Sequence, residues 1–281
     1  MTDGPSRTTG DDRSALEVDI DITVPHAVRV YDYLLGGTDN FAADRAAAEA
    51  LGVAYGGLDN ARAYARDNLD YLERVVHYLV DEIGLRQFLN IGTGIPSPEN
   101  AYALPQALGP ETRVVYVDDD PVVLAHAHSL LRSTREGATD FVVADLHQPV
   151  AILERARATL DMAQPMAIVI TNLHFVGRDE NPYEIVGQLV GAVAQGSHLA
   201  MCHLANDLQT PERTAALETL SAATRETFCL RSHAELERFF AGLDLVEPGV
   251  VQIAQWRPKE IDPGPVGDGV APFYGGVGRK P

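Results

Sequence analysis

From Gln87 to the end of the chain, short apolar segments alternate with segments that have the pattern of helices. The apolar segments are nearly continuous, which is typical of parallel strands covered by helices on both faces. Strands that alternate with helices favour an α/β fold built on one mostly parallel sheet. The predicted strands are 88–91, 113–117, 140–144, 166–171, 197–202, 244–247 and the FYGGVGRK segment at 273–280.

Two segments precede this alternating region. Residues 1–22 are rich in Gly, Ser, Thr and Asp, and we interpret them as a flexible arm. Residues 23–84 have the pattern of three helices separated by paired glycines, and we interpret them as an N-terminal helical cap. Residues 85–281 then form the predicted sheet core. Its helices are expected at 99–108, 121–131, 150–159, 182–193, 210–224 and 232–240, with a Pro- and Gly-rich loop at 257–272.

The starts of several helices are predicted from capping chemistry. Proline is tolerated in a first turn, so Pro25 is expected to open the first helix. Short polar side chains accept hydrogen bonds from the free N–H groups of a first turn. The candidate caps are Asp39 or Asn40 for the second helix, Asp59 or Asn60 for the third, Thr210 for 210–224, and Ser232 with Glu235 for 232–240.

Charge and cysteine content narrow the classes of partner. The 281 residues carry 22 Lys and Arg against 40 Asp and Glu, a formal net charge of −18. Such a surface repels phosphate backbones, so we expect no nucleic-acid partner. Cys202 and Cys229 fall in no metal-ligand spacing, so no metal site is predicted. The sequence has neither a bilayer-length apolar segment nor a signal-peptide pattern, so we expect a cytoplasmic protein without a membrane partner.

The stretch FLNIGTGIP, residues 88–96, joins a predicted strand to a glycine-rich turn. Gly92 and Gly94 would let the backbone of this turn approach a ligand closely. The dinucleotide fingerprint requires a third glycine, and Ser97 stands at that position. The turn therefore favours a nucleotide-like ligand over a standard NAD site.

Acidic residues follow the next two predicted strands. Asp118 and Asp119 end the strand RVVYV, and Asp145 follows the strand DFVVA. Ligands of α/β sheets bind at the carboxyl ends of the strands, where a carboxylate can accept both hydroxyls of a ribose. Asp118 is the first candidate for that contact and Asp119 the second. Asp145 is a candidate to accept from the amine of an adenine, with Leu146 beside the ring.

These motifs carry a family resemblance. FLNIGTG, VVYVDDDPVVL and FVVADL resemble the motifs of class I S-adenosylmethionine-dependent methyltransferases. The segments RVYDYLLGGTDNFAADRAAAE, IGTGIPSPEN, NLHFV and YGGVGRKP are similar to a bacterial S-adenosyl methyltransferase family, formerly a domain of unknown function. The resemblance covers nearly the whole chain from about residue 20. It implies a Rossmann-like sheet with an antiparallel last strand, and S-adenosylmethionine as cofactor with S-adenosylhomocysteine as product.

The resemblance also implies roles for individual residues. The implied cofactor contacts are Asn90, Gly92, Thr93, Gly94, Asp118, Asp119, Asp145, Leu146 and Asn172. Asn90 departs from the family pattern, because an acid usually occupies this position and holds the amino group of the methionine moiety. An amide brings no charge, so Asp32 or Asp39 is a candidate substitute. His174, after the fourth strand, is either a catalytic base or a polar wall of the site.

The N-terminal helices are expected to cover the open strand ends. We interpret residues 22–60 as a lid that shapes the acceptor pocket and excludes water. The lid and pocket candidates are Tyr31, Gly37, Asp39, Asn40, His174 and His203.

The predicted function is transfer of a methyl group to an unidentified acceptor, which the acidic surface suggests is a small molecule. One alternative is a non-catalytic protein of the same fold that binds S-adenosylmethionine or S-adenosylhomocysteine. A less favoured alternative is an NAD-dependent oxidoreductase. The sequence leaves the oligomeric state open.

Overall fold

The computed structural model describes residues 21–92, 94, 104–120, 123, 126, 133–224, 226–258 and 271–281. Most of the predicted arm, Thr93, most of the helix predicted at 121–131 and most of the loop predicted at 257–272 lie outside the described residues.

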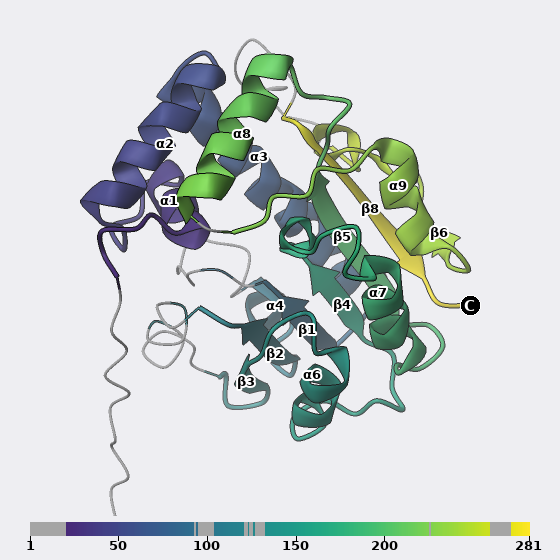
Figure 1. The fold of residues 1–281 in the computed structure, drawn as a ribbon. Helices are drawn as coiled ribbons and strands as arrows, with labels where there is room; N and C mark the ends of the chain where they lie inside the picture. Colours follow the sequence, from purple (N-terminus) through teal and green to yellow (C-terminus); the bar gives the residue numbers. More distant parts are fainter. Residues whose placement is uncertain are drawn as a thin grey trace, which may run out of the picture.

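An eight-stranded sheet forms the centre of the molecule (Figure 1). Its strands are β1 (Gln87–Ile91), β2 (Arg113–Asp118), β3 (Ala138–Val143), β4 (Ala167–Ile170), β5 (His198–Leu204), β6 (Asp244–Leu245), β7 (Val251–Gln252) and β8 (Phe273–Arg279). The strand order is β3-β2-β1-β4-β5-β8-β6, with β7 also paired to β8. The first five strands of this order run parallel, and β8 is antiparallel to β5. The predicted mostly parallel sheet with an antiparallel last strand is confirmed.

Helices cover both faces of the sheet. The α-helices are α1 (Ala27–Leu34), α2 (Ala42–Ala54), α3 (Leu58–His77), α4 (Leu104–Leu108), α6 (Pro149–Ala156), α7 (Pro182–Gly191), α8 (Pro211–Thr224) and α9 (His233–Glu237). A π-helical turn, Tyr78–Glu82, extends α3, and 3-10 turns occupy Leu173–Phe175, Arg238–Phe240 and Ile253–Gln255. None of the helices in these described ranges combines the length and apolar composition that a bilayer-spanning segment requires.

Two hydrophobic cores lie on opposite faces of the sheet. Along β1, Phe88 packs into the core shared with α1, α2 and α3, and Leu89 packs into the core shared with α6, α7 and α9. This alternation follows from the two-residue period of a strand. Both side chains are fully buried, which explains why the strand reads as a continuous apolar run.

The N-terminal helices α1 and α2 gather with α8 at one end of the molecule (Figure 1). A buried ion pair joins the first two, because the Asp44 carboxylate accepts from Nε of Arg29 at 3.0 Å and from the backbone N–H of His26 at 2.9 Å. The Glu226 carboxylate, which follows α8, accepts the N–H of Ala27 at 2.9 Å. These contacts join the start of α1 to α2 and to the segment that follows α8.

The predicted caps of the second and third helices are wrong. The second helix begins at Ala42, because the side chain of Asn40 donates to the Asp32 carboxylate instead of capping. The third begins at Leu58, so Asp59 and Asn60 lie inside its first turn. The first helix begins at Ala27, two residues after Pro25.

The capping predictions in the core are confirmed. Thr210 Oγ1 accepts the N–H of Arg213 at the start of α8. Ser232 and Glu235 form a reciprocal capping box at the start of α9. The short strand β7 and the 3-10 turns Leu173–Phe175 and Ile253–Gln255 have no counterpart in the sequence prediction, because two- and three-residue elements lack a readable period. The turn Arg238–Phe240 completes the helix predicted at 232–240.

Candidate functional site

A cavity of about 750 Å³ lies at the carboxyl ends of the parallel strands. Helices α1 and α3 line it on one side, and the segments that follow β1 to β5 line it on the other. The strand order reverses direction between β1 and β4, and such a switch point is where α/β sheets bind ligands. The cavity therefore occupies the position at which this topology exposes polar side chains and free backbone groups.

The glycine turn after β1 forms one wall of the cavity. Gly92 and Gly94 have positive φ angles of 81° and 64°, a region that other residues rarely adopt. A methyl group added at Gly92 would overlap the side chain of Asn172, which follows β4. Thr171 Oγ1 donates to the carbonyl of Gly92 at 2.7 Å. The turn therefore packs closely against the residues that follow β4, and only glycine fits at position 92.

Asp118 closes β2 directly beside this turn. Its carboxylate accepts the N–H of Gly94 at 2.9 Å and the N–H of Asp120 at 3.1 Å, through different oxygens. The side chain is 6% exposed, and burial raises its pKa to about 6 despite these two donors. Each oxygen keeps a further lone pair, so the carboxylate can still accept two ligand hydroxyls.

The segment after β3 contributes a second acidic group. Asp145 Oδ1 accepts the backbone N–H of His147 at 2.9 Å and contacts its Nδ1 at 2.6 Å. Nε2 of the same imidazole lies 3.3 Å from Glu180, and hydrogen bonds and charges from both acids raise its pKa although burial lowers it. Burial, and next the nearby Asp145, raises the pKa of Asp119. Leu146 is buried and lines the cavity between these polar groups.

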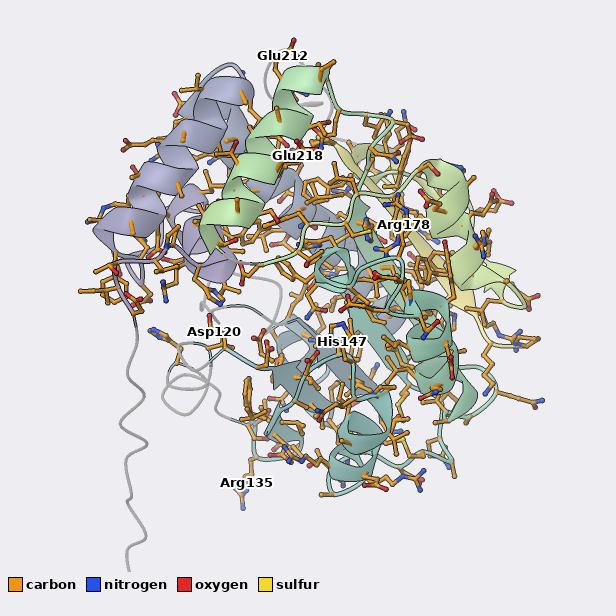
Figure 2. The ribbon with its side chains drawn as sticks, viewed as in Figure 1. Asp120, Arg135, His147, Arg178, Glu212 and Glu218 are labelled. Carbon is orange, nitrogen blue, oxygen red and sulfur yellow. The ribbon has the colours of Figure 1, made fainter. Side chains whose placement is uncertain are left out.

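His26, the residue before α1, lies between two carboxylates that follow β2 and α8. Nδ1 lies 3.0 Å from Asp120 and Nε2 lies 3.1 Å from Glu226. Burial lowers the pKa of His26, but the two carboxylates outweigh it and the pKa is raised above 6.5. Figure 2 shows Asp120 below α1 and His147 near the ends of the sheet strands. The cluster holds the start of α1 over the cavity.

The 3-10 turn after β4 carries His174, whose ring packs against Phe175 and Phe228 at centroid distances of 4.3 Å and 5.9 Å. Burial, and next the charge of Arg231, lowers the pKa of His174 to about 4. The imidazole is therefore neutral at pH 7 and a much weaker base than an ordinary histidine. Nδ1 is buried and has no hydrogen-bond partner among the described residues.

Arg231 and His203 lie behind this turn. The buried guanidinium donates to the carbonyls of Leu173 and Val176 and to Nε2 of His203, at 3.2, 2.8 and 2.7 Å. Nδ1 of His203 contacts the carbonyl of Leu204 at 2.7 Å. Because both ring nitrogens of His203 are engaged within the protein, its imidazole supports the turn and does not line the cavity.

The structure brings most of the predicted site residues together. Those that line the cavity are Tyr31, Gly37, Gly92, Gly94, Asp118, Asp119, Asp145, Leu146, Asn172 and His174. Asn90 lies within β1 and is buried, and it is not among the lining residues. Asp39 and Asn40 also lie outside the lining, because the N–H of the first and the side chain of the second donate to the Asp32 carboxylate. Asp32 and Asp39 were proposed to replace the acid that is missing at Asn90, and of these two Asp32 lines the cavity and Asp39 does not.

Several cavity residues were missed by the sequence analysis. His26, Asp120, Glu226 and Phe228 reach the cavity through contacts between distant segments, so no local pattern marks them. Thr171 is the exception, since it directly precedes Asn172 at the end of a predicted strand and could have been inferred.

The cavity is strongly acidic. The carboxylates that line it are Asp32, Asp70, Glu73, Asp118, Asp119, Asp120, Asp145 and Glu226. Among the described lining residues, Arg66 on α3 is the single arginine or lysine, and it forms no ion pair with any described residue. The site therefore suits a ligand with one carboxylate and a larger cationic or hydroxyl-bearing part.

Known proteins resemble this chain along nearly its full length. The sequence model of the S-adenosyl methyltransferase family matches residues 13–281. A duf574 family protein from Streptomyces avermitilis MA-4680, known from a crystal structure, is 39% identical and superposes with a TM-score of 0.87 over 93% of this chain and 99% of that chain. A proposed methyltransferase from Thermobifida fusca YX is 37% identical, with a TM-score of 0.82 over 92% and 96% of the two chains.

A more distant structure shares the fold. The plantazolicin methyltransferase BpumL, solved with a triazolic desmethylPZN analogue and S-adenosylhomocysteine, is 12% identical and has a TM-score of 0.50 over 90% of this chain and 95% of that chain. At this identity the likeness concerns the fold alone. No curated protein sequence matches the chain.

Proposed function

Because this chain belongs to the S-adenosyl methyltransferase family, we propose that its cavity places S-adenosylmethionine beside a small-molecule methyl acceptor. The family establishes the chain as an S-adenosylmethionine-dependent methyltransferase. When bound, the cofactor supplies an electrophilic methyl group on a positively charged sulfur. The protein's own contribution is to bind, orient and shield the two reactants.

The fit of the cofactor rests first on the glycine turn and Asp118. Gly92 and Gly94 line the cavity without side chains, so a ligand can approach their backbone, and the adjacent Asp118 carboxylate can accept the two ribose hydroxyls. We assign the adenine amine to Asp145, with Leu146 against the ring, and keep Asp119, which also lines the cavity, as the second candidate for the ribose hydroxyls. The adjacency of these groups on β1, β2 and β3 is the observation that carries the proposal.

Charged side chains on α1 and α3 are candidates to bind the amino-acid part of the cofactor. We assign its carboxylate to Arg66, whose guanidinium forms no ion pair with the described residues. Its ammonium group is assigned to the acids that share this side, Asp32 on α1 and Asp70 and Glu73 on α3. This arrangement would compensate for Asn90, which stands where the family pattern has an acid.

A small acceptor is favoured by the enclosure of the site. A volume of about 750 Å³ lies within the range of pockets that bury drug-sized ligands. In this proposal the cap formed by α1, α2 and α3 covers the reacting atoms and excludes water, which strengthens the electrostatics of the site.

The test is calorimetric titration of the purified protein with S-adenosylmethionine, S-adenosylhomocysteine and NAD. We expect the first two to bind and NAD to bind at least tenfold more weakly. Binding of both without turnover of any acceptor would favour the non-catalytic alternative. Absence of binding by a folded protein would contradict the proposed use of the cavity.

A further inference from the structure

The sheet topology divides the cavity into two halves. The strand-end residues assigned to the cofactor follow β1, β2 and β3, which occupy one side of the sheet. The other half lies over the ends of β4, β5 and β8, where Asn172, His174, Leu204 and Phe273 line the cavity. If the cofactor binds as proposed above, this second half is left for the methyl acceptor.

We propose that the methyl acceptor is an uncharged, planar aromatic compound that presents an N–H or O–H group to the turn after β4. This inference deepens the proposed function and rests on it. It concerns the chemistry of the second half of the cavity, which the cofactor assignment leaves unexplained.

An aromatic wall supports the first part of the proposal. Phe175 and Phe228 meet edge to face at 5.2 Å, and His174 packs against both. Phe273 and Tyr31 add two further rings to the lining of the cavity. The Tyr31 hydroxyl donates to the carbonyl of Ala65 at 3.0 Å, so what remains for a ligand is the aromatic surface. Rings in such an arrangement favour a planar aromatic guest.

The charge distribution supports an uncharged acceptor. The carboxylates contributed by strand ends all follow β2 or β3, and Glu226 is paired with His26. Those of α1 and α3, Asp32, Asp70 and Glu73, are assigned above to the ammonium group of the cofactor. Beneath the acceptor half lies the buried guanidinium of Arg231, whose described hydrogen bonds go to two carbonyls and the neutral His203. A cationic amine placed above this charge would be repelled without a facing carboxylate from β4, β5 or β8 among the described residues.

Two buried polar atoms support a hydrogen-bond donor on the acceptor. Asn172 Oδ1 and His174 Nδ1 come from the same turn, and neither has a hydrogen-bond partner among the described residues. A buried polar group without a partner is costly, so a ligand that supplies one gains affinity. The amide oxygen can only accept, so it requires a donor on the ligand, and Nδ1 of the neutral imidazole accepts in the tautomer that carries its proton on Nε2.

The test uses four probes that share one ring and differ in one group. Protein saturated with S-adenosylhomocysteine is titrated at pH 7.5 with aniline, phenol, toluene and benzylamine, and binding is followed by NMR. The first two carry a neutral donor, the third has no donor, and the fourth is cationic. We expect aniline and phenol to bind at least tenfold more tightly than benzylamine and several-fold more tightly than toluene.

A pair of variants localises the binding. Phe228→Leu should weaken aniline binding at least threefold and leave affinity for S-adenosylhomocysteine unchanged. Phe141→Leu, a half-buried phenylalanine of β3 outside the cavity, should change neither. Equal or tighter binding of benzylamine, absence of binding by all four probes, or equal effects of the two variants would overturn the inference. Failure of S-adenosylhomocysteine itself to bind would instead contradict the proposed function.

Discussion

Replacing Asp118 with asparagine should stabilise the ligand-free protein at pH 8 while it weakens cofactor binding. Burial raises the pKa of this carboxyl from 3.8 to about 6. An acid whose pKa is raised by folding destabilises the folded state as pH rises through the interval between the two values. The ionised carboxylate therefore lowers the free energy of unfolding at pH 8, and the penalty is smaller at pH 5.

The magnitude follows from the pKa and the hydrogen bonds. A pKa that is about two units higher in the folded than in the unfolded state lowers the free energy of unfolding by about 3 kcal/mol at pH 8 and by about half of that at pH 5. Asparagine has one accepting oxygen, so the N–H of Gly94 or of Asp120 loses its partner at a cost of about 1 kcal/mol. The net gain for Asp118→Asn is then about 2 kcal/mol at pH 8 and under about 1 kcal/mol at pH 5.

Urea unfolding at the two pH values measures this difference. The single tryptophan, Trp256, is fully buried and reports on unfolding by its fluorescence. Asp179→Asn removes the same charge from an exposed position and controls for the net charge of −18. In parallel, affinity for S-adenosylhomocysteine should fall at least tenfold in Asp118→Asn, because an acceptor for the ribose hydroxyls is lost. A variant that is less stable than the parent at pH 8, or equally stabilised at both pH values, would contradict a raised pKa at Asp118.

Three further predictions concern other parts of the site. Arg66→Gln should weaken the binding of S-adenosylhomocysteine about tenfold in calorimetry. It should leave the affinity for 5′-methylthioadenosine, which lacks the carboxylate, unchanged. Equal losses of affinity for both ligands would contradict the assignment of Arg66. Gly92→Ala should destabilise the protein by about 1–3 kcal/mol in urea unfolding, because φ at this position is positive and the added methyl group would overlap Asn172. The control Gly187→Ala lies in α7 with open space around it and should be neutral or stabilising by up to about 1 kcal/mol. The same response at both sites would contradict the close packing of the glycine turn. His26→Gln should reduce thermal stability more at pH 6 than at pH 8.5. A histidine whose pKa is raised by folding contributes stability that is present below pH 6.5 and is lost as the pH rises through its pKa in the folded state. A loss that does not depend on pH would mean that the histidine is uncharged.

The parts of the site that the sequence predicts are those set by local pattern. Asp118 and Asp145 each follow a continuous apolar strand, and the carboxyl ends of parallel strands meet at one edge of a sheet. Their location at the cavity could therefore be inferred without any knowledge of long-range contacts. Their roles in binding the cofactor stay predictions.

The remaining features depend on contacts between distant segments. The carboxylate that holds the start of α1 comes from Glu226, 199 residues further along the chain. Asn40 fails as a cap because the Asp32 carboxylate, eight residues earlier, competes for its side chain. His203 was predicted in the pocket from its place after a strand, but Arg231 engages its ring from behind. Local spacing carries no information about such competition between partners.

The most direct test is a crystal structure of the protein with S-adenosylhomocysteine. We expect the ribose hydroxyls within hydrogen-bond distance of the Asp118 carboxylate, the adenine beside Leu146, and the sulfur facing the turn that carries Asn172 and His174. Density for the ligand away from the carboxyl ends of β1 to β3, or a ribose that makes no contact with Asp118, would contradict it.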